Sequence, residues 1–76
     1  MNRFHIALDY NGKKLEGEVI PQSVHSIQGI PLKHKLILNG EDKGLIVCTS
    51  QKWHSTKIKD QKLVDTIGNY ITEWYE

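Results

Sequence analysis

The stretch DQKLVDTIGNYITEWYE, residues 60–76, decides the fold that this chain can adopt. Its apolar residues recur at the spacing that gathers side chains on one face of an α-helix. They are Leu63, Val64, Ile67, Tyr70, Ile71 and Trp74. Asp60 precedes them and carries a carboxylate suited to cap the first free amides of a helix. The sequence therefore predicts an amphipathic helix over residues 60–75.

Gly68 falls in the middle of this predicted helix, at the edge of its apolar stripe. A glycine there costs about 1 kcal/mol of helix stability relative to alanine. The missing side chain offsets that cost if it lets the helix approach a neighbouring layer. We therefore predict that the helix packs closely on a sheet at Gly68.

Residues 3–20 follow a different period, with apolar and polar residues alternating on both sides of Asn11-Gly12. Asn-Gly is well suited to the type I′ turn of a two-residue β-hairpin, because both residues tolerate positive φ. With this loop, the hairpin has an apolar face and a charge-complementary face in one register. The predicted apolar face consists of Phe4, Ile6, Leu8, Leu15 and Val19. This agreement makes a hairpin the expected N-terminal element.

Pro21 should end the hairpin, because proline cannot donate to a central strand ladder. Residues 21–31 contain both prolines of the chain and form its longest irregular segment. Val24, Ile27 and Ile30 are expected to anchor the segment to the core. Long loops often carry function, although a simple connection is the commoner role.

Residues 32–38 return to the strand pattern, with His34 and Leu36 among the inward-facing residues. A turn over 39–42 and further strands at 44–49 and 53–55 are expected to follow. A four-residue turn sets Leu36 opposite Leu45, and it directs Leu45 and Val47 inward. We prefer that register to a two-residue Asn39-Gly40 turn, which sets Leu36 opposite a lysine.

The predicted fold class is α+β, in one domain that spans residues 1–76. An antiparallel sheet of four or five strands, ordered as a β-meander, occupies residues 3–55. One C-terminal helix, residues 60–75, packs on one face of that sheet. A small barrel capped by the helix is the alternative architecture.

Composition indicates the compartment. The only cysteine, Cys48, cannot form an intrachain disulfide, and small secreted domains usually have several. The N-terminus leads directly into a strand pattern, and no apolar run approaches the roughly 20 residues that cross a bilayer. We therefore expect a cytoplasmic protein that does not associate with a membrane.

Histidines and the cysteine show no pattern that indicates chemistry. No two of the four histidines are closer than nine residues, and Cys48 has no second cysteine to share a metal. The six glycines are scattered, and none opens the predicted helix to cradle a phosphate. The sequence therefore predicts no catalytic, cofactor-binding or metal-binding residues, no cofactor, and no enzymatic activity.

Lysines dominate the middle of the chain, although the net charge is only +1. A small sheet with lysines and an aromatic ring can bind single-stranded nucleic acid by backbone contacts and stacking. The residues that would form such a surface are Lys33, Lys35, Lys52, Trp53 and Lys57. Against this reading, Arg3 is the only arginine, and a thin core needs Trp53 as a packing residue. Weak nucleic-acid binding is therefore the alternative function.

Several short motifs together resemble a type of small bacterial single-domain protein. They are Asp9-Tyr10-Asn11-Gly12-Lys13, Leu38-Asn39-Gly40, Trp53, and the tail Leu63-Val64-x-x-Ile67-Gly68-x-Tyr70-Ile71-x-x-Trp74-Tyr75. The resemblance implies a β-meander with a C-terminal amphipathic helix. It implies no activity, cofactor or partner.

A sheet with one covered face leaves its other face and its edges exposed, and an edge can pair with a strand of another protein. The leading functional hypothesis is therefore a non-catalytic protein-interaction or accessory module with an unidentified protein partner. The sequence leaves the partner and the oligomeric state open.

Overall fold

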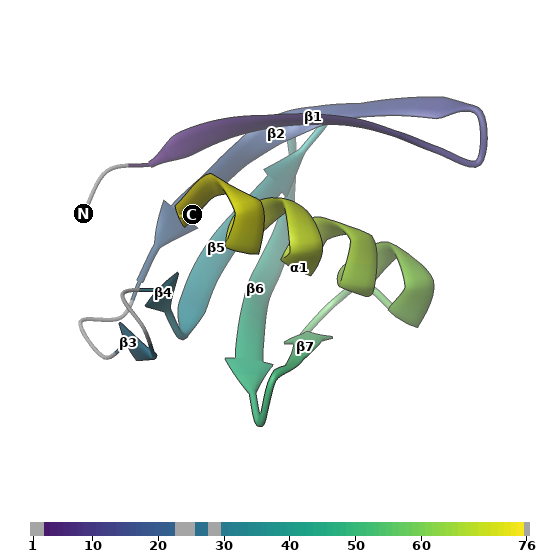
Figure 1. Ribbon diagram of the computed structural model, residues 1–76. Helices are drawn as coiled ribbons and strands as arrows, with labels where there is room; N and C mark the ends of the chain where they lie inside the picture. The colour runs from purple at the N-terminus through teal and green to yellow at the C-terminus, as the bar shows by residue number, and fades with distance from the viewer. Residues whose placement is uncertain (1–2, 23–25, 28–29, 76) are drawn as a thin grey trace.

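The computed structural model describes residues 3–22, 26–27 and 30–75. Its elements are β1 (Phe4–Tyr10), β2 (Lys13–Pro21), β3 (Ser26–Ile27), β4 (Ile30–Pro31), β5 (Lys33–Leu38), β6 (Glu41–Thr49), β7 (Lys52–Ser55) and α1 (Gln61–Tyr75). Five strands form an antiparallel sheet in the order β1-β2-β5-β6-β7, and β3 pairs with β4 separately. The predicted α+β meander with one C-terminal helix is confirmed. Figure 1 shows that the sheet curls into a half-barrel, with α1 on its concave side.

The β1–β2 hairpin has the predicted register in full. Asn11 and Gly12 form its turn with φ of 51° and 77°, which is the type I′ conformation that Asn-Gly favours. Phe4 pairs with Val19, and the ladder continues to the last pair before the turn. Phe4 and Val19 are both buried on the concave side. The alternation and the turn residues were thus sufficient to place this hairpin.

The predicted four-residue turn between β5 and β6 is wrong. Asn39 and Gly40 form a two-residue turn with φ of 49° and 79°, so that Leu38 pairs with Glu41. A bulge then shifts the register, and His34 pairs with Ile46. Ile46 is consequently the fully buried residue of β6, whereas Leu45 and Val47, predicted to point inward, belong to the opposite face.

The bulge explains why a regular β5–β6 ladder predicted the wrong residue pairs. Gly44 lies in it with φ of 74°, a conformation that glycine adopts readily. Its amide donates to Asp42 Oδ1 over 2.7 Å. The turn itself is tied to β2, because the Asn39 amide donates to the Glu16 carbonyl over 2.6 Å. The extra residue in β6 moves the inward side chains by one position.

The core fills the space between the curled sheet and α1. Its buried apolar residues are Phe4, Ile6, Val19, Leu36, Leu38, Ile46, Trp53, Val64, Ile67 and Ile71. Asp60 caps the helix as predicted, since its Oδ1 accepts the amides of Lys62 and Leu63 over 3.1 and 3.3 Å. No helix in the described part of the chain has the length and apolar character needed to cross a membrane.

Gly68 brings the helix against Trp53, as predicted. A Cβ atom on Gly68 would collide with Cδ1 of the buried Trp53 ring, which leaves no room for a side chain. Trp74, at the other end of the helix, differs from the prediction because it remains 56% exposed. The last helical turn lies beside the edge of the sheet, where no further strand covers it (Figure 1).

Candidate interaction surface

The sheet has two edge strands, β7 and β1, and α1 covers the first of them. β7 has only four residues. The Gln61 side chain donates from Nε2 to the Trp53 carbonyl over 2.9 Å, so this carbonyl already has a partner. Gly68 holds the helix against the same tryptophan. An open groove of about 600 Å³ remains between β7 and α1, with Asp65 and Asn69 among its polar lining residues.

The other edge, β1, has seven residues and lies open along its middle. A two-residue type I′ turn makes Tyr10 and Lys13 a hydrogen-bonded pair, and such pairs alternate along an antiparallel ladder. The peptide groups of His5, Ala7 and Asp9 therefore point away from β2. Their amides and carbonyls form a row at the edge of the sheet.

Glu16 on β2 provides an independent check of this alternation. The same rule directs its peptide groups away from β1 and toward β5. Its carbonyl accepts the Asn39 amide over 2.6 Å, and its amide donates to Asn39 Oδ1 over 3.0 Å. The observed bonds have the direction that the rule requires. The assignment of open peptide groups on β1 is therefore consistent with the neighbouring strand.

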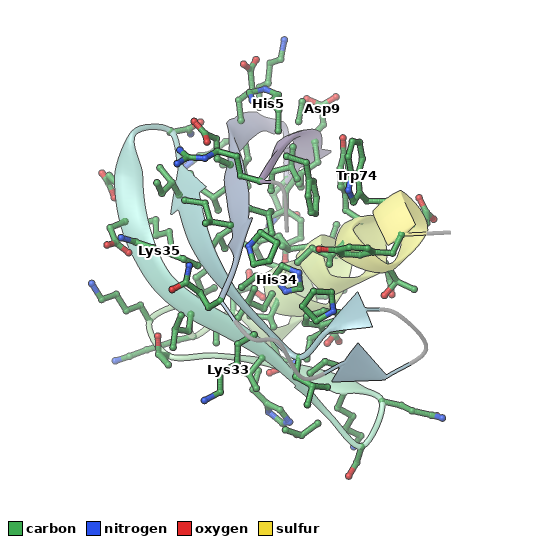
Figure 2. The ribbon with its side chains drawn as sticks, turned by 90° about the vertical axis from the view of Figure 1, so that its left-hand side faces the viewer. His5, Asp9, Lys33, His34, Lys35 and Trp74 are labelled. Carbon is green, nitrogen blue, oxygen red and sulfur yellow. The ribbon has the colours of Figure 1, made fainter. Side chains whose placement is uncertain are left out.

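No hydrogen bond from residues 3–22, 26–27 or 30–75 outside the hairpin ladder reaches the peptide groups of His5, Ala7 or Asp9. The three side chains are exposed. Figure 2 shows His5 and Asp9 pointing outward from the molecule. A strand with exposed side chains and unpaired peptide groups is a ready template for another strand.

Contacts with α1 fix both ends of β1. At one end Trp74 stacks on Phe4, with ring centroids 4.5 Å apart and planes 11° apart. At the other end the Tyr10 hydroxyl donates to Asp60 Oδ2 over 2.9 Å. Desolvation and this carboxylate raise the pKa of Tyr10, so the hydroxyl keeps its proton. These contacts hold the strand while its middle stays accessible.

The convex face of the sheet is mixed in character. Half-buried apolar residues alternate there with charged residues from one strand to the next. The apolar members are Ile20, Ile37, Leu45 and Val47, and the charged members include Glu18, Lys33 and Lys35. Lys35 pairs with Asp42 over 3.5 Å. This face therefore presents neither a continuous apolar patch nor a basic one.

The structure does not bring the five residues of the nucleic-acid alternative onto one surface. Lys33 and Lys35 lie on the convex face of β5, whereas Trp53 is only 6% exposed on the concave side. Lys52 is at the start of β7, and Lys57 follows that strand near Gly44. The tryptophan is enclosed between sheet and helix and has no free ring face for a base to stack on.

His34 is the most perturbed titratable residue. It is fully buried, on the inward face of β5 where the sequence pattern placed it. Its Nε2 lies 3.1 Å from the Tyr75 hydroxyl, and its Nδ1 has no partner among the described residues. Burial lowers the pKa of His34 to about 4. The imidazole is therefore a neutral core group between Phe4 and Trp53 (Figure 2).

Cys48, His5 and His54 form no metal-binding group with His34. Cys48 is half-buried opposite Trp53, and burial raises the pKa of its thiol, which opposes formation of a nucleophilic thiolate. His25, Val24 and the glycine of the 21–31 segment lie outside the described residues. Within the described ranges, no three histidine, cysteine or acidic side chains are grouped closely enough to hold a metal ion.

Comparisons of the chain with protein-family models, curated proteins and solved structures find no match. Function is therefore inferred from the residues of this chain. The open edge at His5, Ala7 and Asp9 was not singled out by sequence reasoning, although the signal was present. The Asn11-Gly12 turn fixes which peptide groups of β1 face β2, and hence which ones face away.

Proposed function

We propose that this protein is a non-catalytic interaction module that binds a protein partner by pairing an extended segment with β1. The observation that carries the proposal is the row of peptide groups at His5, Ala7 and Asp9 to which no other described residue bonds. Strand addition uses such groups for main-chain hydrogen bonds, and the side chains on alternate sides supply specificity. The lone Cys48 and the absence of predicted disulfides favour a reducing, cytoplasmic setting.

β1 lacks the usual features that protect an edge strand. Natural proteins blunt exposed edges with short strands, prolines, bulges, lysines or a covering element. β1 is seven residues long, pairs in a regular register, and carries neither proline nor lysine. Ala7, a small and exposed residue, occupies its centre. These features suit a strand that receives a partner.

The partner segment should match the two sides of β1. On the concave side, Ile6 and Leu8 alternate with the open peptide groups, and the exposed part of Trp74 lies beside Phe4. On the convex side the neighbours are His5 and Asp9. An extended segment with apolar residues on one side and polar residues on the other fits this arrangement.

The experiment compares two baits in affinity capture from a nuclease-treated lysate. Ala7→Pro removes the central edge amide, and Asn69→Lys alters the groove beside β7 while leaving β1 intact. We expect Ala7→Pro to lose the specific partner and Asn69→Lys to retain it. The captured protein is then purified and added to the wild-type chain. Slower amide exchange at His5, Ala7 and Asp9 supports the proposal.

Two results would overturn it. One is capture that survives Ala7→Pro but fails with Asn69→Lys, which would assign binding to the β7 groove. The other is binding of the purified partner with unchanged exchange at the three β1 amides. Circular dichroism of both variants confirms that each retains the fold before capture is compared.

A further inference from the structure

We infer that the segment received by β1 is β1 of a second copy of this chain, paired antiparallel about a two-fold axis at Ala7. This inference rests on the proposed strand-pairing function of the same edge. A two-fold axis makes an interface self-complementary, so each subunit presents the same residues to the other. In such a pair, the residues of β1 lie opposite the same residues of the other copy in reverse order, so the sequence of β1 must be complementary to itself.

Placing the axis at Ala7 gives the longest pairing. All seven residues from Phe4 to Tyr10 then have a partner across the interface. Ala7 is an open-edge residue, so its amide and carbonyl form a reciprocal hydrogen-bonded pair with Ala7 of the partner subunit. An axis at His5 or at Asp9 shortens the overlap, and the latter sets two like charges opposite each other.

Charge complementarity favours the same register. With the axis at Ala7, His5 lies opposite Asp9 of the partner subunit, and the contact occurs twice by symmetry. A ring N–H of the imidazole can donate to the carboxylate, and hydrogen-bonded side-chain pairs across strands are favourable. Both side chains are exposed and directed outward in the isolated subunit (Figure 2). The pairing also removes the like-charge contact that an Asp9-centred axis creates.

The concave side is equally self-complementary. Ile6 lies opposite Leu8 of the partner subunit, and Phe4 lies opposite Tyr10 of the partner subunit. Both pairs are of the apolar or aromatic type that stabilises antiparallel strands. Among the described residues, Trp74 is the only large apolar side chain that is exposed, at 56%, and it stacks on Phe4 at this edge. The interface therefore reaches this exposed indole ring.

The test uses the purified chain alone and three variants: His5→Asp, Asp9→Lys and the double variant. Within one subunit, residue 5 lies opposite Glu18 and residue 9 opposite Lys14. Each single change therefore adds a like-charge pair inside the hairpin, and the double variant retains both. Any recovery in the double variant must come from pairing between subunits. Urea unfolding of each variant measures the intramolecular part separately.

Sedimentation velocity from micromolar to millimolar concentration gives the dimer Kd. We expect wild type to dimerise, and His5→Asp to weaken the dimer about tenfold through two repulsive contacts. Asp9→Lys should weaken it less, and the double variant should recover to within about threefold of wild type. Amide exchange at Ala7 in wild type should slow as concentration rises.

Three outcomes would overturn the inference: a monomer at every concentration, a dimer that His5→Asp does not weaken, or a double variant no better than the weaker single one. If the chain is monomeric yet Ala7→Pro abolishes capture of another protein, the second-copy inference fails while the strand-pairing function stands. If neither self-association nor capture depends on β1, both fail together.

Discussion

The two edge strands of the sheet differ in how far the helix covers them. β7 is short, lies along α1, and has the Trp53 carbonyl bonded to Gln61. β1 is longer, and its outer edge is left open, although Phe4 stacks on Trp74 of α1 and Tyr10 bonds to the capping residue Asp60. A half-barrel has two edges, and one helix can cover only one of them closely. The difference shows that the position of the helix determines which edge is left for a partner.

Gly68 accounts for the choice of edge. Because it has no side chain, the helix approaches the Trp53 ring so closely that a Cβ atom would collide with it. The helix is thereby drawn toward β7 rather than β1. At the opposite flank, contact relies on long side chains such as Trp74 and Tyr10. One glycine thus covers one edge and exposes the other.

Removing the helix is the strongest way to break this asymmetry. Truncation after Lys59 deletes Val64, Ile67 and Ile71, which are almost fully buried. Burial of each such side chain contributes roughly 1.5–3 kcal/mol, so their sum is comparable with the 5–15 kcal/mol that stabilises a typical domain. We expect residues 1–59 to be unfolded by circular dichroism. A dispersed, folded NMR spectrum of that fragment would show that the helix is an appendage.

A pair of proline substitutions tests which peptide groups of β1 are open. Leu8→Pro removes an amide directed at β2 and leaves the facing carbonyl without its donor, so it should cost about 1–3 kcal/mol relative to Leu8→Ala. Ala7→Pro removes an amide directed at solvent, and the free energy of unfolding should stay within about 1 kcal/mol of wild type. Urea unfolding of dilute, monomeric protein measures both. Equal costs would contradict the assigned alternation.

His34 lies in the core between the two edge strands. Its ring is next to Phe4 of β1 and Trp53 of β7. Burial lowers its pKa from 6.5 to about 4, so the unfolded chain binds a proton more readily than the folded one. Stability should therefore be full above about pH 6.5 and fall as the pH drops toward 4, by about 3 kcal/mol.

Urea midpoints between pH 7.5 and 4.5 measure this loss. His34→Phe replaces the imidazole with an apolar ring and should flatten the profile in this window. The exposed carboxylates Glu41 and Asp42 have lowered pKa values, so their contribution is lost below the window. A profile for His34→Phe as steep as that of wild type would assign the acid sensitivity to other groups.

The elements with local signals were predicted from sequence and confirmed. The hairpin followed from its alternation and Asn11-Gly12, and the helix followed from its apolar spacing and Asp60. The β5–β6 register was not predictable. The bulge depends on the positive φ of Gly44, and the pattern of apolar and polar residues does not indicate it. Exposure of Trp74 was also missed, since it depends on where the helix crosses the sheet.

The sequence predicted that the sheet would have an open edge, but it did not predict which edge strand would be open. Exposed edges follow from any open sheet, and the turn type assigns the open peptide groups of β1. Which edge the helix covers depends on a tertiary contact, Gly68 against Trp53, between residues that are distant in sequence. Sequence suggested that Gly68 approaches a neighbour without showing which strand it meets.

Gln61→Ala tests the covered edge with the smallest expected effect. The Gln61 amide donates to the Trp53 carbonyl over 2.9 Å and to Asp65 Oδ1 over 2.8 Å. Both bonds lie near solvent, so losing them should cost about 1 kcal/mol in urea unfolding. Lys62→Ala, at the neighbouring exposed position, serves as the control and should change stability by less than about 0.5 kcal/mol. If Gln61→Ala costs no more than this control, the glutamine does not secure the β7 edge, and the packing of the helix on Trp53 holds it there without this hydrogen bond.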